Sequence, residues 1–257
     1  MTHDLRLAWH FIRRELRERY RGSFTGFGWA LLQPLIQLAI YAFVFVQIFK
    51  AKVPGAGAPG YIPFLVVGMW PWIAFSEAVL RSTTSIQENA ALIGKVALPR
   101  ALLVLSASAS SFLLHLGGFV AIVLALSLAG KDIMLARLPL ALLLYVPMFA
   151  LAMGFGLLFA AIQVFVRDLA QALGQLLMLM MFAAPIFYDR SSLPEQYQHF
   201  LSYNPFTFYV EAMRSLVLGY GSLPWTAWAT AMTVAAGMLA FGYWVFHRLD
   251  SHFEDFL

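Results

Sequence analysis

Apolar residues fall along this chain in six long blocks, and polar, Gly- or Pro-containing segments separate them. The blocks cover 29–49, 61–80, 101–129, 138–166, 172–188 and 225–246. A helix of roughly 20 apolar residues crosses a bilayer. We therefore predict an all-α integral membrane protein with six transmembrane helices, forming a single transmembrane domain over 1–257.

The longest polar interval lies between the second and third blocks, at 81–100 (RSTTSIQENAALIGKVALPR). Ser85, followed three residues later by Glu88, is a capping-box pattern that predicts a helix start. Leu92 and Ile93 would give this short helix apolar side chains. We expect this helix to project into water on one side of the membrane, where it would form a binding surface for an ATPase that this chain does not contain.

The first 22 residues predict an amphipathic helix lying in the membrane interface. Apolar residues recur at three- and four-residue spacing, and the other faces carry arginines (Arg6, Arg13, Arg14, Arg17, Arg19 and Arg21). The helix could serve only as a topology anchor. Alternatively, its arginines could also bind an anionic, lipid-linked substrate.

The segment 189–224 is too long and too apolar for a plain loop. Ser192 is the expected cap of a first short helix that ends near Tyr203, where Asn204 and Pro205 interrupt the chain. A second helix is expected over 206–218. Gly219 would close this second helix.

These two short helices are expected to enter the outer leaflet again, because their backbone groups are satisfied internally. They could cover an outer opening as a lid, with Glu211 and Arg214 paired three residues apart. The alternative is an ordinary interfacial hairpin.

Composition and charge support a membrane protein. Of 257 residues, 61% are hydrophobic and 12% are charged, about half the charged fraction of a soluble domain. The net charge of +4 comes largely from the arginines before the first block, which favours a membrane surface over nucleic acid. The inner segments hold eleven basic residues against six in the outer ones, which predicts that both termini are cytoplasmic.

Several chemistries are excluded by the sequence. It has no cysteine, so it forms no disulfide or thiolate metal site. It contains no G-x-x-x-x-G-K-[ST] and no H-E-x-x-H, so we expect no internal ATPase and no enzyme activity. The remaining interpretation is a transporter that receives its energy from a separate protein. A secondary transporter or a membrane scaffold stays open as an alternative.

His115 is an ionisable residue inside a predicted span, which makes it a functional candidate. Equally, it could be a neutral histidine bonded to a nearby serine or to a backbone carbonyl. The small residues of 106–111 (SASASS) favour close approach of two helices around it.

Four stretches resemble the type-2 ABC exporter permeases for polysaccharides, which export O-antigen, capsule and teichoic acid. They are RELRERYRGSFTGFGWALLQPL (14–35), NAALIGKVALPR (89–100), VRDLAQALG (166–174) and APIFYDRSSLPEQYQHFLSYNPFTFYVEAMRSLVLG (184–219). The order and spacing of these stretches are what make the resemblance specific. Together with the six predicted spans, the resemblance covers essentially the whole chain. One departure is Ala97-Leu98 before Pro99, where members often carry a phenylalanine.

The resemblance implies a homodimer with two copies of a separate nucleotide-binding subunit, which uses ATP and Mg while this chain holds no cofactor. It also implies a bacterial inner-membrane location and export of glycans on undecaprenyl diphosphate, here expected to be O-antigen. The region implied to couple to the ATPase contains Gln87, Glu88, Asn89, Leu92, Ile93, Lys95 and Arg100. The implied periplasmic gate contains Asn204, Pro205, Glu211 and Arg214.

The substrate chemistry adds two expectations. The diphosphate would meet Arg13, Arg14, Arg17, Arg19 and Arg21 at the cytoplasmic gate. Sugars stack on aromatic rings, and the candidate channel-lining residues are Tyr41, Phe45, Trp70, Trp72, Phe182, Phe187 and Tyr209, which could also serve only in packing. Within the same architecture, an exporter of a small lipid or drug is the alternative.

Overall fold

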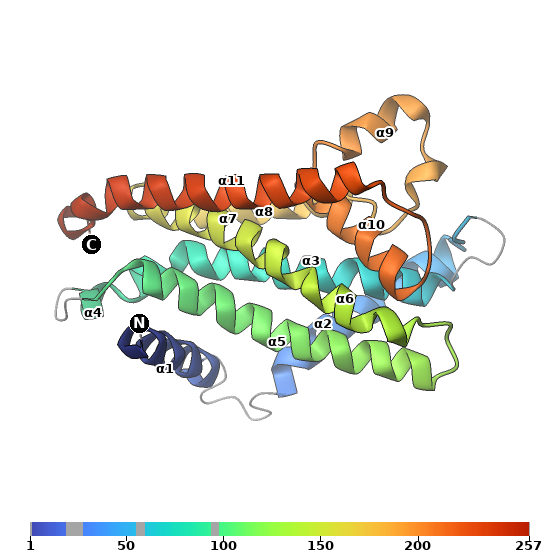
Figure 1. Ribbon diagram of the computed structural model, residues 1–257, viewed down its shortest axis with the longest axis horizontal. Helices are drawn as coiled ribbons and strands as arrows, with labels where there is room; N and C mark the ends of the chain where they lie inside the picture. Colours follow the sequence, from blue (N-terminus) through green and yellow to red (C-terminus); the bar gives the residue numbers. More distant parts are fainter. Residues whose placement is uncertain (1, 19–27, 55–59, 94–97, 257) are drawn as a thin grey trace.

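The computed structural model describes residues 2–18, 28–54, 60–93 and 98–256, and every regular element among them is a helix (Figure 1). Five stretches in this part of the chain have the length and composition of membrane spans. They are Leu31–Ile48, Tyr61–Glu88, Ala101–Leu128, Leu135–Phe165 and Trp225–Phe253. The all-helical fold is thereby confirmed for the described residues, and five of its helical stretches are long and apolar enough to span a membrane.

The predicted fifth span differs from the structure. Instead of covering 172–188, helix α8 (Leu169–Phe182) ends early, and turns and bends carry the chain through 183–188. Pro185 accounts for the end, because proline donates no backbone hydrogen bond and restricts the residue before it. Fourteen residues extend about 21 Å, which is short of the roughly 30 Å hydrocarbon core. The count of six spans therefore stays a prediction.

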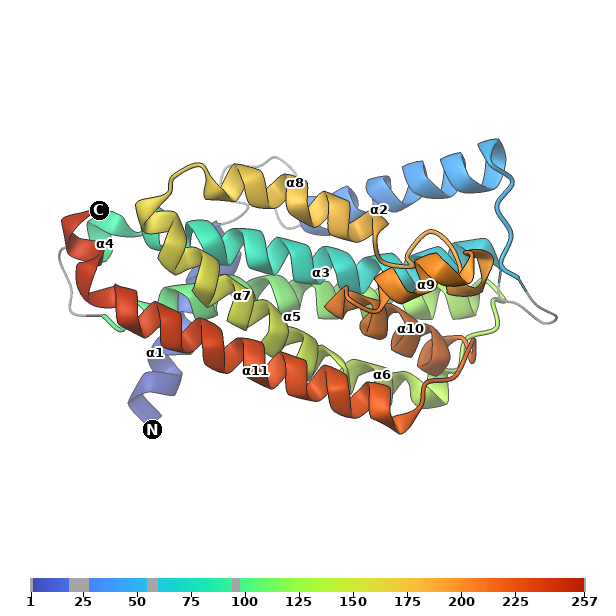
Figure 2. The ribbon, with the colours of Figure 1, turned by 90° about the horizontal axis from the view of Figure 1, so that it is seen from above.

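Helix α3 (Tyr61–Glu88) is the centre of the bundle and contacts α5 (Ala101–Leu128) and α7 (Tyr145–Phe165) along its length (Figures 1 and 2). The predicted end at residue 80 and the predicted cap at Ser85 are wrong. The hydroxyls of Thr83 and Ser85 donate to the carbonyls of Val79 and Ser82, both at 2.8 Å. Because these hydroxyls are satisfied within the helix, the polar residues do not end it.

The remaining spans flank this centre. One is α2 (Gly28–Ala42), which continues as the π-helical η1 (Phe43–Ile48). Another consists of η2 (Leu135–Arg137), α6 (Leu138–Leu143) and α7, with a break at Leu144. The last is α11 (Trp225–Leu249), which leads into η4 (Asp250–Asp255).

Small residues allow the helices to approach closely, as the sequence predicts for the serine-rich run. Ser106, Ser108, Ser110 and Ser111 are all buried on α5. On α7, Gly154 faces Gly242 of α11, and a Cβ added to Gly242 would collide with the Gly154 carbonyl. Such contacts are typical of membrane helix pairs.

Both termini lie at the same end of the bundle, beside the four-residue α4 (Ala90–Ile93), and we call this the termini end (Figures 1 and 2). Helix α1 (Thr2–Glu18) packs on α5 there and runs across the bundle rather than along it (Figure 2). The opposite end, where α9 and α10 lie, we call the hairpin end.

A second apolar core stabilises the termini end. Phe253 of η4 is fully buried in it, and Phe11, Leu92 and Ile93 pack against its edge. Its buried members are Ile86, Leu103, Val104, Met153, Leu157, Ala160, Ala161, Val164, Phe246 and Phe253. The C-terminal tail thereby joins the ends of four long helices.

The hairpin consists of α9 (Glu195–Leu201) and α10 (Pro205–Val217), so the two predicted short helices are present. Asn204 caps α10, because its side-chain oxygen accepts from the Phe206 amide at 3.0 Å. Gly219 has φ +65°, the left-handed conformation that ends a helix. The predicted cap at Ser192 is wrong, since this residue belongs to the separate turn η3 (Arg190–Ser192).

Candidate functional site

Gln87, one of the predicted coupling residues, forms an internal amide pair. It donates to the Gln163 carbonyl at 2.9 Å, and the Gln163 side chain donates back to it at 3.0 Å. Gln163 also donates to the Arg167 carbonyl and accepts from the Ala170 amide, both at 2.8 Å. This pair holds the end of α3 against the turn between α7 and α8.

The residues around α4 divide into exposed and packed ones. Glu88 is exposed, whereas Leu92 and Ile93 are half-buried against the second core. Each of these aliphatic side chains therefore has a packed part and a part open to a partner. Lys95 lies outside the described residues.

Arg100 binds the C-terminal tail. It pairs with the Asp250 carboxylate at 2.7 Å, also donates to the Asp250 carbonyl, and lies over the Phe253 ring at 5.9 Å. Its side chain is only 16% exposed. Arg100 thus fixes the tail to the start of α5, a role that the sequence does not indicate.

The arginines of α1 have two different environments. Arg14 donates to the Asn89 side chain at 2.6 Å and pairs with Glu18 at 3.2 Å. Arg6, Arg13 and Arg17 are exposed. A hollow of about 600 Å³ is lined by His10, Phe11, Arg13, Arg14, Arg17 and Glu18. The other two predicted arginines, Arg19 and Arg21, lie outside the described residues.

The predicted channel aromatics also form two groups. Tyr41, Phe45 and Phe182 surround Phe187, with ring centroids 4.9, 5.0 and 5.2 Å from it. These rings come from α2, η1 and α8, and Phe182 is 44% exposed. Phe187 itself is only 3% exposed, so Phe182 is the most exposed ring of this cluster.

The second group lies inside the protomer. Trp70, Trp72 and Tyr209 are between 1% and 3% exposed. Trp72 packs on Phe206 of α10 with centroids 4.9 Å apart, and the Trp70 indole donates to the His115 carbonyl at 2.8 Å. Their place is the core between α3, α5 and α10.

Arg214 is buried at the hairpin end and acts as an internal anchor. It lies 3.3 Å over the Phe64 ring and donates to the carbonyls of Phe64, Pro185 and Ile186 at 3.3, 2.5 and 2.7 Å. The last two carbonyls belong to the turns after α8 and therefore lie outside any helix. Burial lowers the pKa of Arg214 to about 9, while Asp189 and Glu211 oppose this shift.

The predicted Glu211–Arg214 pair is replaced by another. The Glu211 carboxylate lies 3.8 Å from Arg190, which also donates to the Ser202 hydroxyl at 2.8 Å. Burial raises the pKa of Glu211, against the effect of the two arginines. Asn204, Pro205, Tyr209 and Glu211 share one hollow of about 530 Å³ between α10 and α11. The structure thus brings most of the predicted gate residues together.

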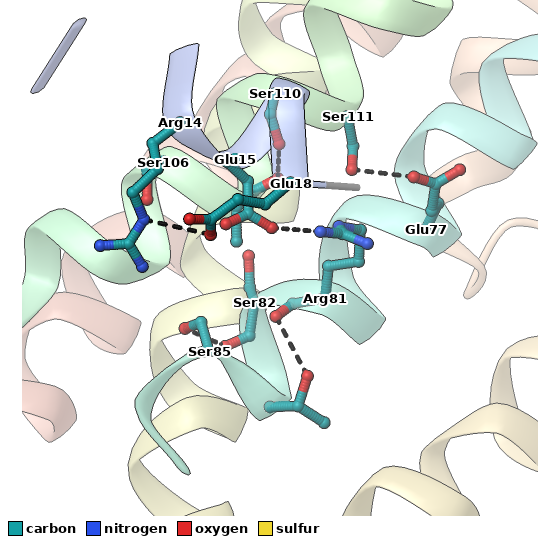
Figure 3. A network of polar contacts seen from close by, with 12 residues as sticks. Arg14, Glu15, Glu18, Glu77, Arg81, Ser82, Ser85, Ser106, Ser110 and Ser111 are labelled. Carbon is teal, nitrogen blue, oxygen red and sulfur yellow. Dashed lines mark hydrogen bonds and ion pairs between the residues drawn. The ribbon is translucent and has the colours of Figure 1, made fainter. Parts of the chain in front are cut away.

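His115 has a partner that the sequence did not suggest. Its Nε2 lies 2.8 Å from the Glu77 carboxylate. The Ser111 hydroxyl donates to the other oxygen of Glu77 at 3.0 Å, as Figure 3 shows. His115 is fully buried, so this contact connects α3 to α5 inside the bundle. Polar residues in apolar segments, such as Gln163 and Glu77, were the signal available for these contacts.

Comparison with known proteins identifies the family. The family model described as ABC-2 type transporter matches residues 6–218. An O-antigen export system permease protein RfbA from Klebsiella pneumoniae is 26% identical over 244 residues, covering 95% of this chain and 92% of that protein. The RfbA of Myxococcus xanthus is 31% identical over 191 residues, covering 72% and 69% of the two chains. The polysialic acid transport protein KpsM of Escherichia coli is 26% identical over 230 residues, covering 88% of each. The chain belongs to the ABC-2 type transporter family, and its relatives are permeases of polysaccharide export.

Proposed function

We propose that this chain is the membrane-spanning subunit of an ATP-driven exporter that moves a polysaccharide linked to undecaprenyl diphosphate from the cytoplasm to the periplasmic face of the bacterial inner membrane. The observation that carries the proposal is the match to an O-antigen export permease along nearly the whole length of both chains. O-antigen is accordingly the proposed glycan.

The proposed assembly is a homodimer with two copies of a nucleotide-binding subunit that hydrolyses ATP with Mg. The chain lacks a phosphate-binding loop of its own. Its termini end presents the exposed Glu88 at the end of α3 and the half-exposed Leu92 and Ile93 of α4. An amphipathic surface of this kind suits a protein partner. In this assembly the termini end faces the cytoplasm.

The proposed route for the substrate connects the two ends. The exposed arginines of α1 would attract the carrier diphosphate, because guanidinium groups bind phosphate through paired hydrogen bonds. The Phe187 cluster would offer rings to passing sugars. The hairpin, with Glu211 and its hollow, would form the periplasmic gate.

The test is a strain that lacks this chain, with its surface polysaccharide and its lipid-linked intermediates measured. We expect surface polymer to disappear and the lipid-linked polymer to accumulate on the cytoplasmic side, with both effects reversed by the intact gene. Normal surface polymer, with no second exporter in the strain, would overturn the proposal. Export of a small lipid or drug would then be examined with the same strain.

A further inference from the structure

Two polar contacts join α1 to α3 at the termini end. Glu15 pairs with Arg81, and Arg14 donates to Asn89 at 2.6 Å (Figure 3 shows Glu15 facing Arg81). The side chains of Arg81 and Glu15 are 29% and 19% exposed, so this pair is partly shielded from water. These contacts use one face of α1, while Arg13 and Arg17 remain exposed.

Asn89 connects these contacts to α4. It follows the last residue of α3, and its side-chain amide donates to the Ser85 carbonyl at 2.9 Å. Its backbone carbonyl accepts from the amides of Leu92 and Ile93 at 2.9 and 3.1 Å, which forms α4. One residue therefore touches α3, α4 and, through Arg14, α1.

This arrangement makes independent movement of α1 and α4 unfavourable. Separating them would break a charge-assisted hydrogen bond and leave partly buried charges without partners. A displacement of α4 would instead carry α1 with it through Asn89, because the contact chain is short and consists of packed or bonded groups.

We propose that the Arg14–Asn89 and Glu15–Arg81 contacts form a latch that transmits movement of α4 to α1 during transport, which makes these four side chains positioning residues for the exporter. The inference rests on the proposed function, since the movement is supplied by the ATPase. It also divides the α1 arginines by role, with Arg14 holding the helix and the exposed ones free to meet the substrate.

Charge reversal tests the latch in the assembled complex. The variants Glu15→Arg and Arg81→Glu should each lower polymer export at least tenfold while the complex keeps hydrolysing ATP, and the double variant should regain most of the export. The control is Asp132→Arg, the same charge change as in Glu15→Arg but at an exposed residue of the hairpin end, which should export normally. A double variant no better than the single ones would overturn the latch. Loss of ATP hydrolysis and protein in proportion to export would also overturn it.

A second measurement does not depend on what is transported. The chain has no cysteine, so Trp9→Cys and Ala91→Cys, both at exposed positions, introduce the only two thiols of each copy of the chain for spin labels. We expect the distance between labels on α1 and α4 to stay the same with and without ATP. In the Arg81→Glu background it should change with ATP. A nucleotide-dependent distance in the intact chain would exclude the latch even if polysaccharide export is established, and a constant distance would support it even if the substrate proves to be another.

Discussion

At the scale of single residues, buried charged side chains at the hairpin end stabilise the fold through contacts that the sequence alone does not indicate. Arg214 supplies hydrogen-bond donors to three carbonyls, two of them in the turns that follow α8. An unsatisfied buried carbonyl costs about 1–3 kcal/mol, so a cation here offsets the early end of that helix. Glu211 and Asp189 place negative charge near it, and Arg190 completes the group.

The raised pKa of Glu211 predicts a pH dependence of stability. Above the ordinary value of 4.5, the folded state holds a proton on this carboxyl more tightly than the unfolded state does. Its contribution to the free energy of unfolding therefore falls as the pH rises from about 4.5 through the raised pKa. In the variant Glu211→Gln the side chain is a neutral amide that does not ionise over this pH range. We expect the stability of the wild type relative to this variant to decrease over that pH range.

Thermal unfolding of the detergent-solubilised protein at a series of pH values measures this difference. Glu195→Gln, at an exposed carboxylate of α9, is the control and should follow the wild-type profile. A wild-type stability that stays constant or rises with pH, relative to that of Glu211→Gln, would contradict the assignment.

At the scale of elements, close helix contacts determine how the spans pack. Gly154 and Gly242 bring the backbones of α7 and α11 together, and Gly156 accommodates Ser82 of α3 in the same way. In a bilayer the lipid tails are as apolar as the side chains, so association depends on such packing rather than on the hydrophobic effect. α11 has the pair of glycines needed for a direct comparison.

We predict opposite effects for two Gly→Ala substitutions on α11. In Gly242→Ala, the new methyl group meets the Gly154 carbonyl and forces the helices apart, which should cost about 1–3 kcal/mol. In Gly237→Ala, nothing lies within 4 Å of the new Cβ, so the higher helix propensity should leave stability equal or raise it by up to about 1 kcal/mol. Thermal unfolding of both variants in the same detergent provides the comparison. Equal losses would show that the α7–α11 contact is not the cause.

At the scale of the whole molecule, the sequence predicts the bundle better than the connections within it. The apolar blocks predict the spans, and Asn204-Pro205 and Gly219 predict the second hairpin helix, because these signals are local. The end of α3 was predicted eight residues early, since Thr83, Thr84 and Ser85 are polar in the sequence but donate to carbonyls of the same helix. No local pattern indicates that Arg100 reaches Asp250 or that Gln87 meets Gln163, because these partners are 150 and 76 residues apart.

The surface of α1 gives the last prediction, which concerns substrate entry. Arg6, Arg13 and Arg17 are exposed, while Arg14 is held by Asn89 and Glu18. Each basic side chain near an anionic membrane surface contributes about 1 kcal/mol of attraction. Three such side chains together contribute about 3 kcal/mol, or roughly a hundredfold in the affinity of α1 for an anionic lipid surface. We expect the triple Arg→Gln variant at these positions to export polymer much more slowly and to accumulate lipid-linked polymer inside the cell.

The matched control replaces three exposed basic residues at the hairpin end, Lys50, Lys131 and Arg137, with glutamine. It removes the same charge from the other side of the bundle, so it should export at the wild-type rate. Both variants are compared at equal amounts of protein in the membrane, which separates entry of the substrate from insertion of the chain. Because the Arg14 contact remains in the α1 variant, normal export by that variant would exclude substrate attraction by the exposed arginines and would leave the latch untouched. Slow export by both variants would instead indicate a general effect of net charge.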